Sequence, residues 1–199
     1  TETTEDVEGI VTLVNRMAQR MRAGGKGKRG KPDFTLSVSN YIPKPHTPFQ
    51  WDGMDSMESL REKQAILRRN IDHRRVKLDL HDISTSLLEA VFARGDRKLG
   101  VVLEEAVEAG CRFDGWNEKF DIAMWRAAFD KHGIDMNFYS CGGVAPDSML
   151  PWDHIHCGVS KNYLKKERAQ AMEGCVTPTC INGSCSGCGA GCESAREIQ

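Results

Sequence analysis

Two short segments alternate between apolar and polar residues and predict β-strands. The period of two places successive side chains on opposite faces of a strand, so each segment has one apolar face. In the first segment the opposite face carries hydroxyl groups, and three prolines at positions 43, 45 and 48 end the strand because proline cannot donate a ladder hydrogen bond. The alternating apolar positions are Phe34, Leu36 and Val38 in the first segment and Val76, Leu78 and Leu80 in the second.

Apolar residues recur at helical spacing in the other segments and predict six amphipathic helices. We expect these helices over about 3–24, 55–70, 84–95, 97–110, 121–131 and 160–174. Thr3 with Asp6 and Asp55 with Glu58 have the spacing of capping boxes, and Ser84 and Ser160 are expected N-caps. The order helix, strand, helix, strand, helix favours an α/β fold, either a βα barrel or a doubly wound sheet.

A barrel would turn the hydroxyl face of the first strand inward, toward a polar cavity. Ser37 and Ser39 are therefore our cavity-facing candidates. Loops at the carboxyl ends of barrel strands build active sites, so Lys44, His46 and Gln50 in the proline loop are candidates for substrate contact. Turn structure and core packing of the same loop are the competing explanation.

Composition and charge indicate which classes of binding partner the chain is expected to have. The chain has 199 residues and a formal net charge of −1, so its overall charge does not attract nucleic acid. The basic segment 23–33 is expected to be a mobile surface loop, with nucleic-acid contact as the minority alternative. Without a run of about 20 apolar residues or a leader peptide, we expect a cytoplasmic protein with no membrane partner.

Five of the eight cysteines lie in the last segment, CVTPTCINGSCSGCGAGC, over residues 175–192. The spacing Cys180-x4-Cys185-x2-Cys188-x3-Cys192, among glycines that allow tight turns, is suited to a structural zinc ion or an iron–sulfur cluster. Cys175 is a further candidate ligand, and the same spacing is also compatible with a redox dithiol or an inert tail. His154 and His156 form a second, weaker candidate metal pair beside the ordinary interpretation of two strand histidines.

Several segments together resemble one protein family. They are SVSNYIPKPHTPFQW (37–51), TETTEDVEGI (1–10), SLLEAVFARGDRKLG (86–100), FDGW (113–116), PWDHI (151–155) and the cysteine tail. This combination resembles the C-terminal part of radical S-adenosylmethionine (radical SAM) proteins, in an uncharacterised group that usually carries an N-terminal B12-binding-type domain. The resemblance extends over nearly the whole chain, from Thr3 to Cys188.

The resemblance implies a three-part organisation. Residues 1–80 would be the last βα units of a radical SAM barrel, residues 81–174 a mostly helical extension, and residues 175–199 a metal-binding tail. The parent protein would bind a [4Fe–4S] cluster, S-adenosylmethionine and, in some members, cobalamin, and it would act on an unknown substrate. Because the chain begins at Thr1 and opens directly on a helix signal, we expect a fragment whose partner is the missing N-terminal half of the barrel.

The chain differs from the family pattern at the motif on which the radical chemistry depends. The C-x3-C-x2-C triad that holds the radical-generating cluster does not occur in these 199 residues, and Cys185-x2-Cys188-x3-Cys192 has the reverse spacing. We therefore expect this chain to be inactive alone and its tail to hold an accessory centre, either zinc or an auxiliary cluster. The competing hypothesis is a stand-alone, metal-stabilised binding or scaffold module without catalysis.

Overall fold

The structure is a computed structural model that describes residues 2–24, 34–181 and 183–192. It divides into two compact units, which are described separately. The first consists of Thr1–Tyr41 and Asp55–Leu88, and the second of Ile42–Met54 and Glu89–Gln199. The proline loop, which follows the first strand directly, therefore belongs to the second unit.

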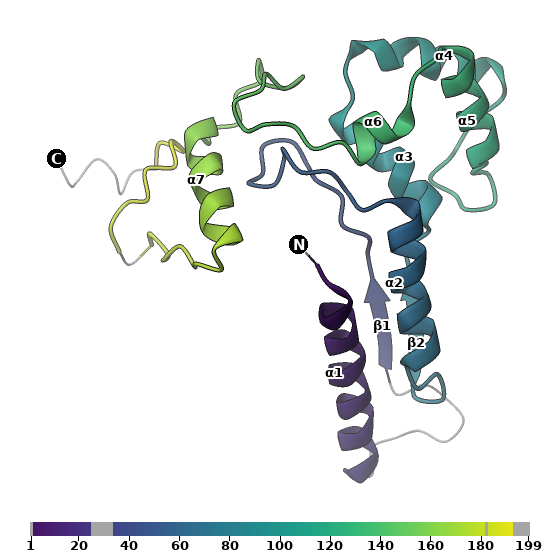
Figure 1. Ribbon diagram of the computed structural model, residues 1–199, viewed down its shortest axis with the longest axis vertical. Helices are drawn as coiled ribbons and strands as arrows, with labels where there is room; N and C mark the ends of the chain where they lie inside the picture. The colour runs from purple at the N-terminus through teal and green to yellow at the C-terminus, as the bar shows by residue number, and fades with distance from the viewer. Residues whose placement is uncertain (1, 25–33, 182, 193–199) are drawn as a thin grey trace. The chain divides into compact units, whose positions relative to one another are not determined.

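The first unit is built on a two-stranded parallel sheet. The elements are α1 (Thr4–Ala23), β1 (Phe34–Val38), α2 (Met57–Asn70), β2 (Val76–Leu80) and the first half of α3 (Ile83–Arg94), as Figure 1 shows. β1 and β2 pair in parallel from Phe34 opposite Val76 to Val38 opposite Leu80. Both predicted strands are confirmed, and α2 connects them as the crossover helix of a βαβ unit.

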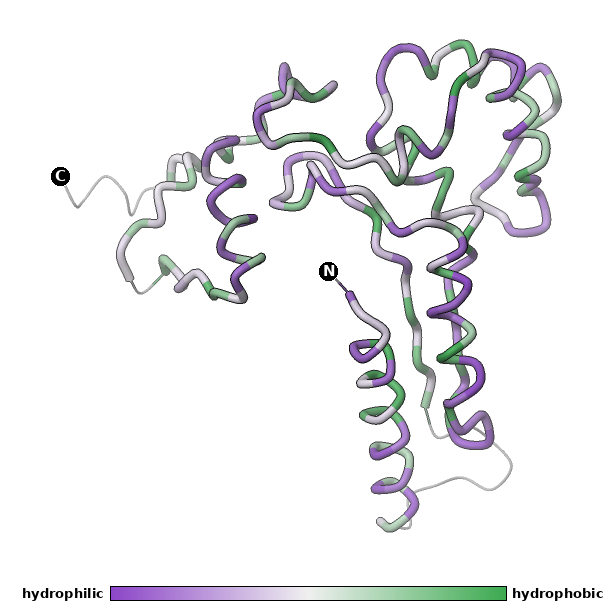
Figure 2. Tube along the Cα trace, viewed as in Figure 1, coloured by the Kyte–Doolittle hydropathy of each residue, from purple (hydrophilic) through white to green (hydrophobic). Residues whose placement is uncertain are grey.

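One face of this sheet is covered by α1 and α2. Val7, Val14 and Ala18 of α1 and Leu67 of α2 are buried against the apolar residues of both strands, and Val76 is 1% exposed. Figure 2 shows how hydrophobic and hydrophilic residues alternate along the two helices. A two-stranded sheet is marginal alone, so this burial is what stabilises it.

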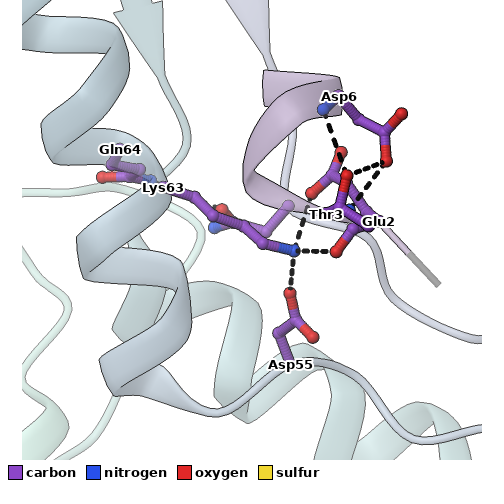
Figure 3. A network of polar contacts seen from close by, with 7 residues as sticks. Glu2, Thr3, Asp6, Asp55, Lys63 and Gln64 are labelled. Carbon is purple, nitrogen blue, oxygen red and sulfur yellow. Dashed lines mark hydrogen bonds and ion pairs between the residues drawn. The ribbon is translucent and has the colours of Figure 1, made fainter. Parts of the chain in front are cut away.

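A lysine connects the beginning of α1 with α2. Lys63 Nζ donates to the Glu2 carboxylate at 2.8 Å and pairs with Asp55, while Thr3 and Asp6 form the predicted capping box of α1 (Figure 3). Partial burial acts to lower the pKa of Lys63, but the hydrogen bonds to Asp55 and Glu2 outweigh it and raise the pKa.

Two predicted N-caps are wrong by one or two residues. Ser56, not Asp55, caps α2 by accepting from the Ser59 amide, because the Asp55 carboxylate is engaged by Lys63. Asp82, not Ser84, accepts from the Thr85 amide at 2.7 Å at the beginning of α3. In both cases a neighbouring polar residue takes the cap.

The second unit is mostly helical. It contains η1 (Arg97–Leu99), α4 (Gly100–Glu108), α5 (Ile122–Lys131), α6 (Met136–Ser140) and α7 (Lys161–Met172), and the short α6 was not predicted. Ser160 caps α7 as expected. Across the described ranges the chain is thus a mixed α/β protein, mostly helical, whose strands are β1 and β2. The barrel itself, like the three-part division at residues 80 and 174, stays a prediction.

Arg94 holds the loop around α6. This buried guanidinium donates from Nη1 to the carbonyl oxygens of Tyr139 at 2.6 Å and Ser140 at 2.9 Å, and from Nη2 to that of Gly142. Gly53 lies against the same turn, where a Cβ atom on residue 53 would come within 1.9 Å of the Cys141 carbonyl oxygen. The residues that follow the proline loop are therefore packed backbone to backbone against the C-terminal end of α6.

We predict that Arg94→Met destabilises the protein by about 3 kcal/mol, because it leaves several carbonyl oxygens without their charged donor. Arg97→Met, at an exposed position three residues away, is the matched control and should change stability by less than about 0.5 kcal/mol. Urea unfolding followed by circular dichroism measures both. Equal effects of the two substitutions would contradict the role given to Arg94.

Candidate functional site

The uncovered face of the sheet carries a row of polar side chains. Because paired residues of parallel strands lie side by side, the register places Thr35 beside Lys77 and Ser37 beside Asp79. Ser37 Oγ donates to Asp79 Oδ2 at 3.1 Å, and Ser39 Oγ lies 3.5 Å from His81 Nε2. Hydroxyl, carboxylate and imidazole groups thus share one exposed face, which we call the polar face.

Asp79 and His81 were not among the candidates predicted from the sequence. The alternation of Val76, Leu78 and Leu80 already places them on the polar face of β2, so the signal was present. The missing information was the pairing of β2 with β1, which the register supplies.

Amide side chains fix the carboxyl ends of both strands. Asn40 Nδ2 donates to Ser86 Oγ of α3 at 2.8 Å, and Gln64 Nε2 of α2 donates to the His81 carbonyl oxygen at 2.9 Å. The His81 amide donates to the Val38 carbonyl oxygen at 3.1 Å, which continues the ladder one step beyond the strands. These bonds hold Ser39 and His81 in place where the strands end.

The structure divides the predicted substrate-facing residues between the two units. Ser37 and Ser39 belong to the first unit, and Lys44, His46 and Gln50 to the second. The exposed Lys44 pairs with Glu89. Gln50 is 3% exposed, and its Oε1 accepts from Trp152 Nε1 at 2.7 Å and from the His46 amide at 3.0 Å. Contact of these five residues with a substrate stays a prediction.

Those two hydrogen bonds give the proline loop a defined shape. His46 has a φ of 58°, in the left-handed region that non-glycine residues rarely adopt, and the Gln50 side chain accepts its amide. Trp51, Leu150, Trp152 and Leu164 form the apolar cluster beneath the loop. The packing explanation for this loop therefore has direct support at Gln50.

The segment before α7 is held by carboxylate–lysine pairs. Asp153 Oδ2 accepts from the Leu150 amide at 2.8 Å and from Lys161 Nζ, and Lys165 pairs with Asp147. Burial acts to raise the pKa of Asp153, but the Leu150 amide, Lys161 and, at longer range, His46 outweigh it and lower that pKa.

All five tail cysteines that we considered as ligands are free thiols. Cys175, Cys180, Cys185 and Cys192 are exposed and Cys188 is half-buried. In the described part of the chain, no three cysteine, histidine or acidic side chains converge as a metal site, so metal binding by the tail is untested. Residues 25–33, which hold the basic positions of the candidate nucleic-acid segment, lie outside the described residues.

Comparison with known proteins gives one relative. A stretch of 104 residues is 25% identical to uncharacterized protein MJ0966 of Methanocaldococcus jannaschii, covering 52% of this chain and 21% of that protein. The chain thus spans about one fifth of the length of the relative it matches. No family model and no solved structure matches the chain. Among the helices that the structure describes, none has the length and apolar character needed to cross a bilayer.

We predict that the polar face contributes little to stability. Ser37→Ala and Ser39→Ala should each change the free energy of unfolding by less than about 0.5 kcal/mol, because both side chains are exposed. Val76→Ala on the buried face should cost about 2 kcal/mol. Chemical denaturation compares the three variants. A loss at Ser37 or Ser39 as large as at Val76 would mean that the polar face is structural.

A second prediction concerns pH. Because the pKa of Asp153 is lower in the folded state, its contribution to stability is complete above about pH 4 and is lost as the pH falls through the folded pKa. The stability difference between wild type and Asp153→Asn should therefore shrink on acidification. Tryptophan fluorescence, to which the buried Trp152 contributes, measures the stability difference during urea titrations, with the exposed Asp130→Asn as control. A difference that does not vary with pH would contradict this assignment.

Proposed function

We propose that this chain is the C-terminal part of a radical SAM enzyme. In this proposal it contributes a βαβ unit of the barrel, loops on the substrate side and an accessory metal site in its tail. The rest of the barrel and the radical-generating [4Fe–4S] cluster, with S-adenosylmethionine and, where present, cobalamin, belong to other parts of the parent protein. The substrate and the reaction are not assigned.

The polar face is the observation that carries the proposal. Parallel sheets almost always have both faces covered, yet α1 and α2 cover only the apolar face of β1 and β2. In a βα barrel the helices lie outside and the opposite faces of the strands line the interior. The pairs Ser37–Asp79 and Ser39–His81 are suited to hydrogen bonding with a polar ligand in such an interior.

The position of the pairs along the strands also supports a functional interior. Ser39 and His81 directly follow β1 and β2, at the carboxyl ends where barrel enzymes place their functional groups. Asn40 and Gln64 hold these ends, so the hydroxyl and the imidazole keep their positions without a ligand. Asp79 offers a carboxylate to a donor group of the ligand, and Ser37 already holds one of its oxygens.

The residues present do not fit the radical-generating cluster. None of the eight cysteines forms a C-x3-C-x2-C triad, so no step of S-adenosylmethionine cleavage is assigned to this chain. The tail fits an accessory centre better, because thiolates at short spacing suit zinc or an iron–sulfur cluster. The partial match to a protein about five times longer than the matched stretch agrees with a role as one portion of a larger enzyme.

The first experiment on this proposal is to sequence the coding DNA upstream of Thr1. We expect an in-frame C-x3-C-x2-C motif there. The full protein, purified without oxygen and reduced with dithionite, should then convert S-adenosylmethionine to 5′-deoxyadenosine and methionine, which chromatography with mass spectrometry detects.

The 199-residue chain, treated in the same way, is the matched control and should form no 5′-deoxyadenosine. A start codon immediately before Thr1, with no cluster motif upstream, would contradict the proposal and favour the stand-alone module. Full-length protein that contains the motif and a reducible cluster but forms no 5′-deoxyadenosine would contradict the assigned reaction class.

A further inference from the structure

The tail folds back along α7 and returns to the beginning of that helix. The Cys175 amide donates to the Gln170 carbonyl oxygen at 2.9 Å, and Thr177 Oγ1 contacts Glu167 and Gln170 at 2.7–2.9 Å, near the end of α7. Further along, the Cys188 carbonyl oxygen accepts from the amide of Ser160, the N-cap of α7, at 2.8 Å. Figure 1 shows this return of the tail beside α7.

The return places two cysteine-bearing segments next to each other. A Cβ atom on Gly189 would lie 3.4 Å from the Gly158 carbonyl oxygen, so the residues that directly follow Cys188 and Cys157 are in contact. Gly158 and Gly189 are far apart in the sequence, so this contact could not be predicted from the sequence. The segment 154–158 and the segment 185–192 therefore meet at the N-terminal end of α7.

Backbone amides already point at two of the tail sulfurs. The Gly187 amide donates to Cys185 Sγ at 3.4 Å and the Ala190 amide to Cys188 Sγ at 3.5 Å. Gly187 and Gly189 have φ values of 69° and 93°, which permit these two tight turns. The two amide contacts fix the turns that carry these sulfurs, and thiolate sulfur is the form in which cysteine binds metals.

The facing segment holds three residues that could ligate a metal, His154, His156 and Cys157, and Cys157 is the one directly beside Gly158, which contacts the tail. His156 Nδ1 accepts from the Gly158 amide at 3.3 Å, so this ring nitrogen is engaged within its own segment. The Cys157 thiol is exposed and makes a long contact of 3.8 Å with the Val159 carbonyl oxygen.

The four sulfurs do not converge among the described residues, so we infer that a bound metal draws Cys157, Cys185, Cys188 and Cys192 together into a four-thiolate centre at the N-terminal end of α7. Cys175 lies outside this centre, because it follows the other end of a 12-residue helix, which is about 18 Å long. Cys180 is left out of the inferred set, which takes Cys157 in its place because Gly158 and Gly189 are in contact. The negative charge of four thiolates around a divalent ion is stabilised by the N-terminal end of a helix.

This inference deepens the accessory site of the proposed function, but it does not depend on the radical chemistry of the parent. The centre would cross-link the segment before α7 to the segment after it, so the helix would be held at its N-terminal end by both. Zinc and an iron–sulfur cluster share this thiolate chemistry. The experiment must therefore separate the two metals as well as the two ligand sets.

The test uses anaerobic loading of the chain with Zn²⁺, with Co²⁺, or with iron and sulfide, followed by metal analysis and visible spectroscopy. Cys157→Ser and Cys188→Ser should each lower bound metal at least tenfold at limiting concentration and weaken the thiolate-to-cobalt charge-transfer band. Cys175→Ser, Cys180→Ser and His156→Gln are matched controls and should retain both. Circular dichroism verifies that each variant keeps its helices.

The possible results distinguish a failure of the inferred ligand set from a failure of the proposed accessory metal site. Loss of metal in Cys188→Ser and Cys180→Ser but not in Cys157→Ser would overturn the inferred ligand set and leave a tail centre intact. Absence of stoichiometric metal in wild type under all three conditions would overturn the accessory site itself. A single bound Zn²⁺ or a broad iron–sulfur absorbance, each lost in Cys157→Ser, would support the inference and identify the metal.

Discussion

The parallel pairing of β1 with β2 is the constraint on which the functional interpretation depends. It makes one continuous apolar surface from two short strands, and α1 and α2 bury that surface. Because side chains alternate along a strand, the same pairing aligns the polar residues on the opposite face. A shift of one residue in either strand would bury Ser37 or Asp79 and expose valine or leucine. Burial of the apolar face therefore also fixes the arrangement of the polar face.

Much of the first unit follows from local sequence patterns. The strands, the helices and the capping box of Thr3 and Asp6 are set by periodicity and by contacts over a few residues, and the structure confirms them. The caps at Ser56 and Asp82 depended on competition between adjacent polar residues, which spacing alone does not decide. Ser37 and Ser39 could be placed on a face, but their partners Asp79 and His81 required the strand register.

The second unit was less predictable because its contacts are long-range. The five-residue helix α6 is too short for a periodic signal, and Arg94, forty-five residues earlier, binds its carbonyl oxygens. Gln50 is polar but buried, because Trp152, 102 residues later in the chain, donates to it. The tail has no apolar period at all, so its return along α7 and the proximity of Gly158 to Gly189 appear only in the structure.

The central claim is that the polar face lines a barrel interior in a larger protein. In that case β1 and β2 gain neighbouring strands, and the backbone amides that point away from the β1–β2 ladder become hydrogen-bonded. Hydrogen–deuterium exchange compares these amides in the 199-residue chain and in the full protein. We predict that they exchange rapidly in the chain alone and are strongly protected in the full protein. Equal, rapid exchange in both would show that no strand joins this sheet and would contradict the barrel.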